Sequence, residues 1–110
     1  MKALKSKIEI TEKAFTQQVK EIAQLFGFEF YHPHLSIHSE RGWPDCSMIR
    51  EIGDGTTHVV FAELKSERGR VTEHQEKWLD MLSRVRVVEA HLWRPSDFEE
   101  IQAILSRRDI

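Results

Sequence analysis

The sequence holds a single cysteine, Cys46, among its 110 residues. One thiol can form neither an internal disulfide nor a cysteine-rich zinc site, and this fits the reducing cytoplasm in which we expect the protein. Long hydrophobic runs are also absent, since no apolar stretch approaches the roughly 18 residues that span a bilayer. The opening segment MKALKSKIEI is too short and too interrupted by charge to be a signal peptide. We therefore expect no membrane partner.

An excess of charge of one sign is missing as well, because 16 basic and 18 acidic residues give a net charge of −2. That balance argues against a protein that coats nucleic acid nonspecifically. It does not exclude a nuclease, since acidic residues that hold divalent cations are neutralised in the working protein. The length and the 31% of charged residues are ordinary for one soluble domain, which we expect to cover residues 1–110.

Hydrophobic periodicity and capping signals predict three helices and four strands. Thr11 can cap the first helix, and Thr72 with Gln75 forms a capping box for the second. Ser96 with Glu99 predicts a third helix start. The predicted helices are 11–26, 72–85 and 96–107, and the predicted strands are 28–38, 45–52, 57–66 and 87–93. This order, α-β-β-β-α-β-α, predicts an α/β fold with a small mixed sheet flanked by helices.

Chemically informative residues lie in the hairpin formed by residues 45–66. Asp45 opens its first strand, and Glu63 and Lys65 share one face at the end of its second. Antiparallel pairing can place Asp45 opposite Glu63, and two neighbouring carboxylates repel unless a cation lies between them. Mg²⁺ takes one or two carboxylates together with water and phosphate oxygens. A lysine beside them could hold the attacking water or balance charge on a phosphate, so the hairpin suits phosphodiester hydrolysis.

Each of these signals also has a simpler interpretation. Pro44 and Asp45 could form an ordinary turn, and E-x-K alone occurs often by chance. The combination of Asp45 with Glu63 and Lys65 across one hairpin favours a site. Glu12 lies three residues before Phe15, which predicts that it extends the inward face of the first helix. The alternative is an acidic first-turn residue favoured by the helix dipole.

The same residues resemble a nuclease family. Pro44-Asp45 and the ELK of residues 63–65 look like the core of the PD-(D/E)xK nucleases. The segments SERGWPD, FAELKSERGRVTEHQEKWLDML and HLWRPSDFEEI are similar to the VRR-NUC branch, in the small stand-alone form found in phage and bacterial genomes. The likeness runs from Glu12 to Ile101. It implies a restriction-endonuclease-like fold, Mg²⁺ or Mn²⁺ as cofactor, and cleavage of DNA.

The resemblance also implies roles for single residues. Asp45, Glu63 and the backbone carbonyl of Leu64 would be metal ligands, and Lys65 would orient or activate the water. Glu12 matches an acidic residue on the first helix of the family and would join the metal ligands. Gln75 matches a glutamine of the family's second helix, although it is also the third residue of the capping box.

Basic residues around the hairpin are the candidates for DNA contact. Arg41 precedes Asp45, and Arg68 and Arg70 follow Lys65 in a run whose simpler interpretation is a solvated turn. Three histidines also precede Asp45, namely His32, His34 and His38. An H-x-H zinc site is possible, but we favour a loop near DNA, with His38 among its contacts.

The resemblance further implies a homodimer acting on branched DNA such as Holliday junctions, in the bacterial host cell if the gene belongs to a phage. Two symmetric cuts in a junction require two sites, which a two-fold dimer supplies. The expected dimer surface is the second helix around Trp78, Met81 and Leu82, together with residues 28–35. The alternatives are a nicking, flap or restriction-type nuclease, or a catalytically idle DNA-binding module on the same fold.

Overall fold

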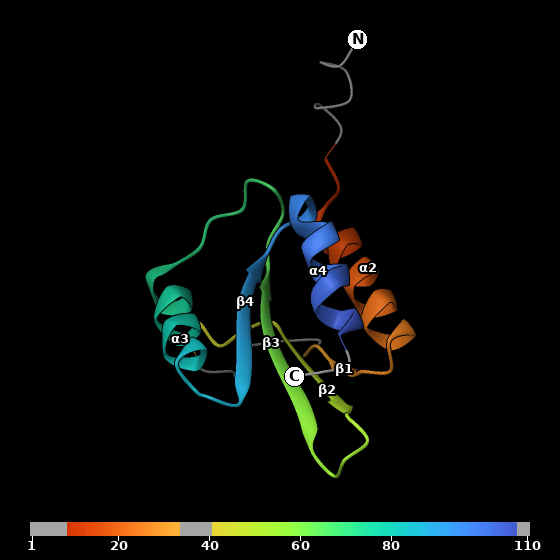
Figure 1. Ribbon diagram of the computed structural model, residues 1–110. Coiled ribbons are helices and arrows are strands. Elements are labelled where there is room, and N and C mark those ends of the chain that lie inside the picture. Colours follow the sequence, from red (N-terminus) through yellow and green to blue (C-terminus); the bar gives the residue numbers. More distant parts are fainter. Residues whose placement is uncertain (1–8, 34–40, 108–110) are drawn as a thin grey trace.

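The computed structural model describes residues 9–33 and 41–107. Its centre is a four-stranded sheet with helices on both faces (Figure 1). The elements in chain order are α2 (Glu12–Leu25), β1 (Glu29–Tyr31), β2 (Cys46–Glu51), β3 (Thr57–Leu64), α3 (Glu73–Ser83), β4 (Val88–Trp93), the 3₁₀ turn η1 (Pro95–Asp97) and α4 (Phe98–Ser106). The predicted mixed α/β class and the order α-β-β-β-α-β-α are confirmed.

The strands lie in the order β1-β2-β3-β4. The pairs β1–β2 and β2–β3 are antiparallel, and β3–β4 is parallel because α3 carries the chain back between them. Cys46 pairs with Ala62, so the predicted hairpin is confirmed. Alternation along β3 then directs Ala62 and Leu64 to one face of the sheet and Glu63 to the other.

The helices divide between these two faces. In Figure 1, α2 and α4 lie side by side on one side of the sheet and α3 lies on the other. The core between the sheet and the pair α2–α4 consists of Phe15, Val19, Ala23, Phe28, Cys46, Met48, Val60, Ala62, Leu64, Trp93, Ile101 and Leu105. Trp93 is 1% exposed and packs in this core. No helix within the described ranges is both long and apolar enough to cross a membrane.

Local signals account for the ends of two helices. The side chain of Thr11 accepts a hydrogen bond from the Ala14 amide at 3.0 Å, and Gly27, with φ of +90°, ends α2 after Leu25. Thr72 and Gln75 form the predicted reciprocal capping box at the start of α3. Both predictions are confirmed.

Two local predictions are wrong in detail. The strand expected over residues 28–38 is only Glu29–Tyr31 within the described part, and residues 34–38 lie outside the described residues. Ser96 does not cap α4, because its hydroxyl lies 2.8 Å from Glu67 Oε2, and α4 begins at Phe98. A tertiary contact has therefore replaced the local one.

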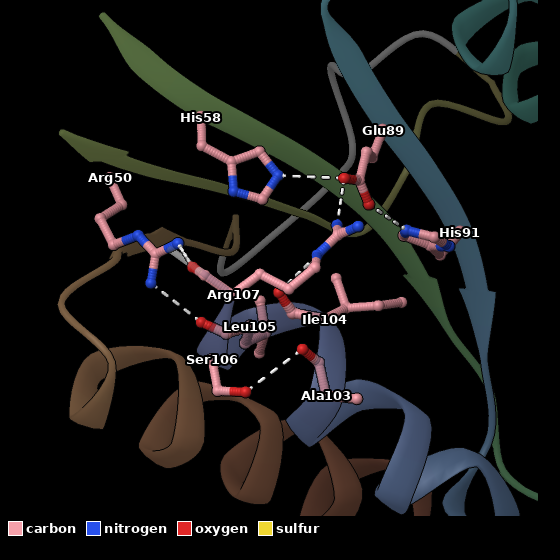
Figure 2. Close-up of polar contacts among 9 residues, drawn as sticks. All are labelled: Arg50, His58, Glu89, His91, Ala103, Ile104, Leu105, Ser106 and Arg107. Atoms are coloured by element: carbon pink, nitrogen blue, oxygen red, sulfur yellow. Dashed lines mark hydrogen bonds and ion pairs between the residues drawn. The ribbon is translucent and has the colours of Figure 1, made fainter. Parts of the chain in front are cut away.

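A buried polar cluster closes the end of the α2–α4 face at the start of β3 (Figure 2). Arg50, which is 5% exposed, donates to the carbonyl oxygens of Phe26 at 3.2 Å and Leu105 at 3.0 Å, and also to that of Arg107. The ends of α2 and α4 thereby gain partners for carbonyls that a helix cannot satisfy itself. Arg50 pairs with His58 near the start of β3, whereas Glu63 is near the end of that strand. The cluster and Glu63 therefore lie at opposite ends of β3.

Candidate functional site

Asp45 and Glu63 meet at one end of the two central strands, where β2 begins and β3 ends. Cys46 pairs with Ala62, and continuing that register places Asp45 opposite Glu63. The Leu64 amide donates to Asp45 Oδ2 at 3.1 Å, which fixes this carboxylate against the end of β3. The proximity that the hairpin predicts is therefore present.

The Glu63 carboxylate is almost completely buried, with 1% of the residue exposed. Its Oε2 accepts a hydrogen bond from Gln75 Nε2 at 2.7 Å and lies 3.7 Å from Lys65 Nζ. Its Oε1 is buried without a hydrogen-bond partner in the described part of the chain. A buried polar atom left without a partner is costly, so Oε1 is suited to a ligand.

Electrostatics at this pair favour a cation. Burial and the neighbouring Asp45 raise the pKa of Glu63 to about 8, while Lys65 acts in the opposite direction. The raised pKa means that the second negative charge is disfavoured in the folded protein. Carboxylate oxygens are the ligands that Mg²⁺ and Mn²⁺ prefer, so Asp45 and Glu63 fit the predicted ion.

The raised pKa of Glu63 predicts how stability changes with pH in metal-free protein. The folded state binds a proton on Glu63 more tightly than the unfolded chain does. The stabilisation from this proton is complete below the unfolded pKa of about 4.5, and it is lost as the pH rises through the folded pKa of about 8. We expect Glu63→Gln to remove this loss, raising the free energy of unfolding at pH 8 by the order of a few kcal/mol.

Urea unfolding in EDTA between pH 6.5 and 9 measures this effect. Over that range the stability of the wild type should fall relative to that of Glu63→Gln. Parallel pH profiles of the two proteins would contradict the buried, repelled carboxylate.

Gln75 links helix capping to the site. Its Oε1 accepts from the Thr72 amide at 2.9 Å, while its Nε2 donates to Glu63. The same side chain therefore caps α3 and contacts the Glu63 carboxylate; the capping-box prediction is confirmed, and the role of Gln75 in a catalytic site stays a prediction.

The loop that precedes Asp45 is held in place by aromatic packing. Trp43 lies edge-on between Phe61 and Trp78, with ring centroids 5.6 Å and 4.9 Å away. Trp78 Nε1 donates to the Arg41 carbonyl at 3.0 Å. Trp78 thus packs this loop against α3, a role that the sequence did not suggest. The one available signal was a Gly-Trp-Pro run directly before the aspartate.

Gly42 is required for this packing. It has φ of +87°, and an added Cβ would lie 2.5 Å from the backbone carbonyl of His74. We expect Gly42→Ala to destabilise the protein by about 1–3 kcal/mol more than Gly55→Ala. Gly55 is the matched control, since it has φ of +90° but no atom of the described residues within 4 Å of its added Cβ. Equal urea midpoints for the two variants would show that the close approach has no energetic weight.

Glu12 does not follow its predicted orientation. The residue is exposed in the first turn of α2, so the expectation of an inward-facing side chain is wrong. Within residues 9–33 and 41–107, no three His, Cys, Asp or Glu side chains form a group that could hold a metal ion. Glu12 is therefore not gathered with Asp45 and Glu63, and its role as a metal ligand stays a prediction. The same holds for the Leu64 carbonyl.

Three of the four proposed DNA contacts are described by the structure, and all three lie at the surface. Arg41, Arg68 and Arg70 are all exposed, and His38 lies outside the described residues, as does His34. Arg94, for which the sequence predicts no role, donates to the carbonyls of Ser66 at 2.7 Å and Glu67 at 3.0 Å. This arginine fixes the loop that follows Lys65.

The fold and site define a mixed α/β protein with two carboxylates and a lysine at one end of the central strands of its sheet. Comparison of the chain with models of known protein families found no match, and searches among curated proteins and solved structures found none either. The likeness to the VRR-NUC nucleases therefore remains a hypothesis carried by the residues themselves.

Proposed function

We propose that the protein is a Mg²⁺- or Mn²⁺-dependent endonuclease that hydrolyses phosphodiester bonds in DNA, with branched DNA as its substrate. The observation that carries this proposal is the buried Glu63 carboxylate opposite Asp45, with Lys65 Nζ 3.7 Å away. Two carboxylates and a cationic group at the end of two paired strands suit the binding of a metal ion and a phosphate. DNA as the substrate is an expectation from the resemblance to VRR-NUC nucleases.

Each residue of the cluster has a separate task in this proposal. Asp45 and Glu63 hold the ion, which when bound stabilises charge on the phosphate and lowers the pKa of its water. The Leu64 amide and Gln75 Nε2 orient the two carboxylates. Lys65 positions the water or stabilises negative charge that develops on the phosphate oxygens.

A panel of labelled DNA substrates tests the proposal. Purified protein is incubated with four-way junction, flap, nicked and linear duplex DNA in Mg²⁺, in Mn²⁺ or in EDTA. We expect metal-dependent products, with the junction cut fastest. If only flap or nicked DNA is cut rapidly, that structure is the substrate and the four-way junction is not. Tight binding without cleavage under any condition would favour a catalytically idle DNA-binding module.

Assembly as a homodimer is a separate expectation. Along α3 and the connection to β4, three apolar side chains are exposed: Met81 by 37%, Val85 by 43% and Val87 by 81%. Covering them in a two-fold interface would remove apolar surface from water. Of the predicted dimer surface, Phe28 is buried in the core and Trp78 is half-buried against Trp43.

Light scattering at micromolar concentration measures the assembly. We expect twice the 13.0 kDa mass of one chain. Met81→Glu should shift the mass to that of one chain, and Glu76→Lys, exposed on another face of the same helix, is the control. A wild-type monomer with and without DNA would remove the junction-resolving role and favour nicking or flap cleavage.

A further inference from the structure

A groove runs between α2 and β1. Its volume is about 630 Å³, within the roughly 300–1,000 Å³ of typical ligand sites. The residues that line it on α2 are Glu12, Lys13, Thr16, Gln17 and Lys20, and those at β1 are Phe30, Tyr31 and His32. Polar and charged side chains therefore line the helix side of the groove, and aromatic rings line the strand side.

This groove opens toward the end of the sheet that holds the candidate site. β1 is antiparallel to β2 and pairs Tyr31 with Ser47, so β1 ends where β2 begins, beside Asp45. The segment before α2 is also close to this end of the sheet, because Glu9 Oε2 lies 3.1 Å from the Nε of Arg68, in the loop after β3. A chain bound in the groove therefore lies at the same end of the sheet as Asp45 and Glu63.

Charge in the groove favours an anionic ligand. Lys13 and Lys20 lie one on each side of Gln17, against the single carboxylate of Glu12. Neither lysine forms an ion pair with any residue that the structure describes. Both ammonium groups are thus available to phosphates, whose neutralisation supplies most of the affinity of nucleic-acid binding.

The aromatic wall suits a nucleobase. Tyr31, the one tyrosine of the chain, is 65% exposed, whereas its neighbour Phe30 packs against the core. An exposed ring beside cations is the arrangement by which proteins stack the bases of single strands. A base inside a duplex presents only its edges, so such stacking requires an unpaired strand.

We propose that the groove between α2 and β1 binds an unpaired DNA strand next to the cleavage site, with Lys13 and Lys20 on its phosphates and Tyr31 stacked on a base. The inference rests on the proposed nuclease function for its biological meaning, and it adds DNA with an unpaired arm, such as a flap, to the branched substrates of that function. The binding itself requires neither metal nor cleavage.

Fluorescence anisotropy in EDTA tests the binding with a labelled oligo(dT) of about 12 nucleotides, a length within the range of single-strand sites. We expect Tyr31→Ala to weaken binding by about fivefold to a hundredfold, the range that stacking on one base contributes. Tyr31→Phe keeps the ring and should bind as the wild type does. Tyr31 lines the groove, as do the two lysines replaced below. Circular dichroism checks that each variant is folded.

The two lysines have a separate signature. The variant Lys13→Ala/Lys20→Ala should reduce the slope of log Kd against log salt by about 1.4, or about 0.7 for each phosphate contact to a single strand. The matched control, Lys77→Ala/Arg86→Ala, removes two exposed cations from α3 and the segment after it, and should leave the slope unchanged.

Wild-type affinity and salt slope in both the Tyr31→Ala and the double-lysine variant would overturn the inference, as would failure of the wild type to bind oligo(dT). The result of this test is independent of the result of the cleavage test of the proposed function. Loss of oligo(dT) binding in the groove variants, with no cleavage by the wild type in any metal, would support the groove and reject the nuclease. Cleavage by the wild type with no effect of the groove variants would do the reverse.

Discussion

Replacing Lys65 with alanine is expected to slow DNA cleavage by roughly 10²-fold or more at saturating Mn²⁺, while DNA affinity changes little. Lys65 Nζ lies 3.7 Å from Glu63 Oε2, so its charge is directed at the place where the ion and the phosphate would meet. A group that acts on charge developing in the transition state affects the rate more than the binding.

Single-turnover cleavage rates and anisotropy with the same DNA separate these effects. Saturating metal is needed because the Lys65→Ala change also removes a favourable charge from Glu63. Lys77→Ala, on the exposed surface of α3, is the control for loss of one positive charge. Equal losses of rate and affinity in Lys65→Ala would make this lysine an ordinary phosphate contact.

Asp45→Asn is expected to reduce cleavage by at least about 10²- to 10³-fold while the protein stays folded. The asparagine side-chain oxygen can still accept the hydrogen bond from the Leu64 amide, so the loop keeps its anchor. What is lost is the negative charge that would bind the ion. Mn²⁺ should also raise the melting temperature of the wild type by binding the folded state, and most of that shift should disappear in the variant.

Asp54→Asn is the matched control for this substitution. Asp54 belongs to the turn at the other end of the same hairpin, where its Oδ1 accepts from the Thr56 amide at 3.0 Å. It should cut DNA at the wild-type rate. Wild-type cleavage by Asp45→Asn would show that Asp45 is only a loop residue.

The meeting of Asp45 with Glu63 could be predicted because a hairpin is a local structure. A short turn and alternation along two strands fix which residues lie opposite each other, and the observed pairing of Cys46 with Ala62 follows that logic. The α3 capping box could be predicted for the same reason, since its partners are three residues apart.

Contacts between distant segments could not be predicted in this way. The hydroxyl of Ser96 contacts Glu67 in place of the local Glu99, because the loop after β3 lies beside it in the fold. Trp43 packs on Trp78, from which it is separated by the whole hairpin. Spacing along the chain contains no information on either pairing.

Glu12 shows the limit of helical periodicity. It continues the spacing that buries Phe15 and Val19, yet it is exposed while those two are fully buried. The residue lies directly after the cap Thr11, where a first-turn carboxylate is favoured by the helix dipole without a buried partner. The simpler interpretation of this glutamate therefore describes its position.

Calorimetric titration of metal-free protein with Mn²⁺ tests most directly whether the Asp45–Glu63 pair is a metal site. We expect saturable binding in the wild type and in Asp54→Asn, and loss of that binding in Asp45→Asn and in Glu63→Gln. Absence of binding by the folded wild type, or wild-type affinity in both site variants, would contradict the proposed metal-dependent nuclease.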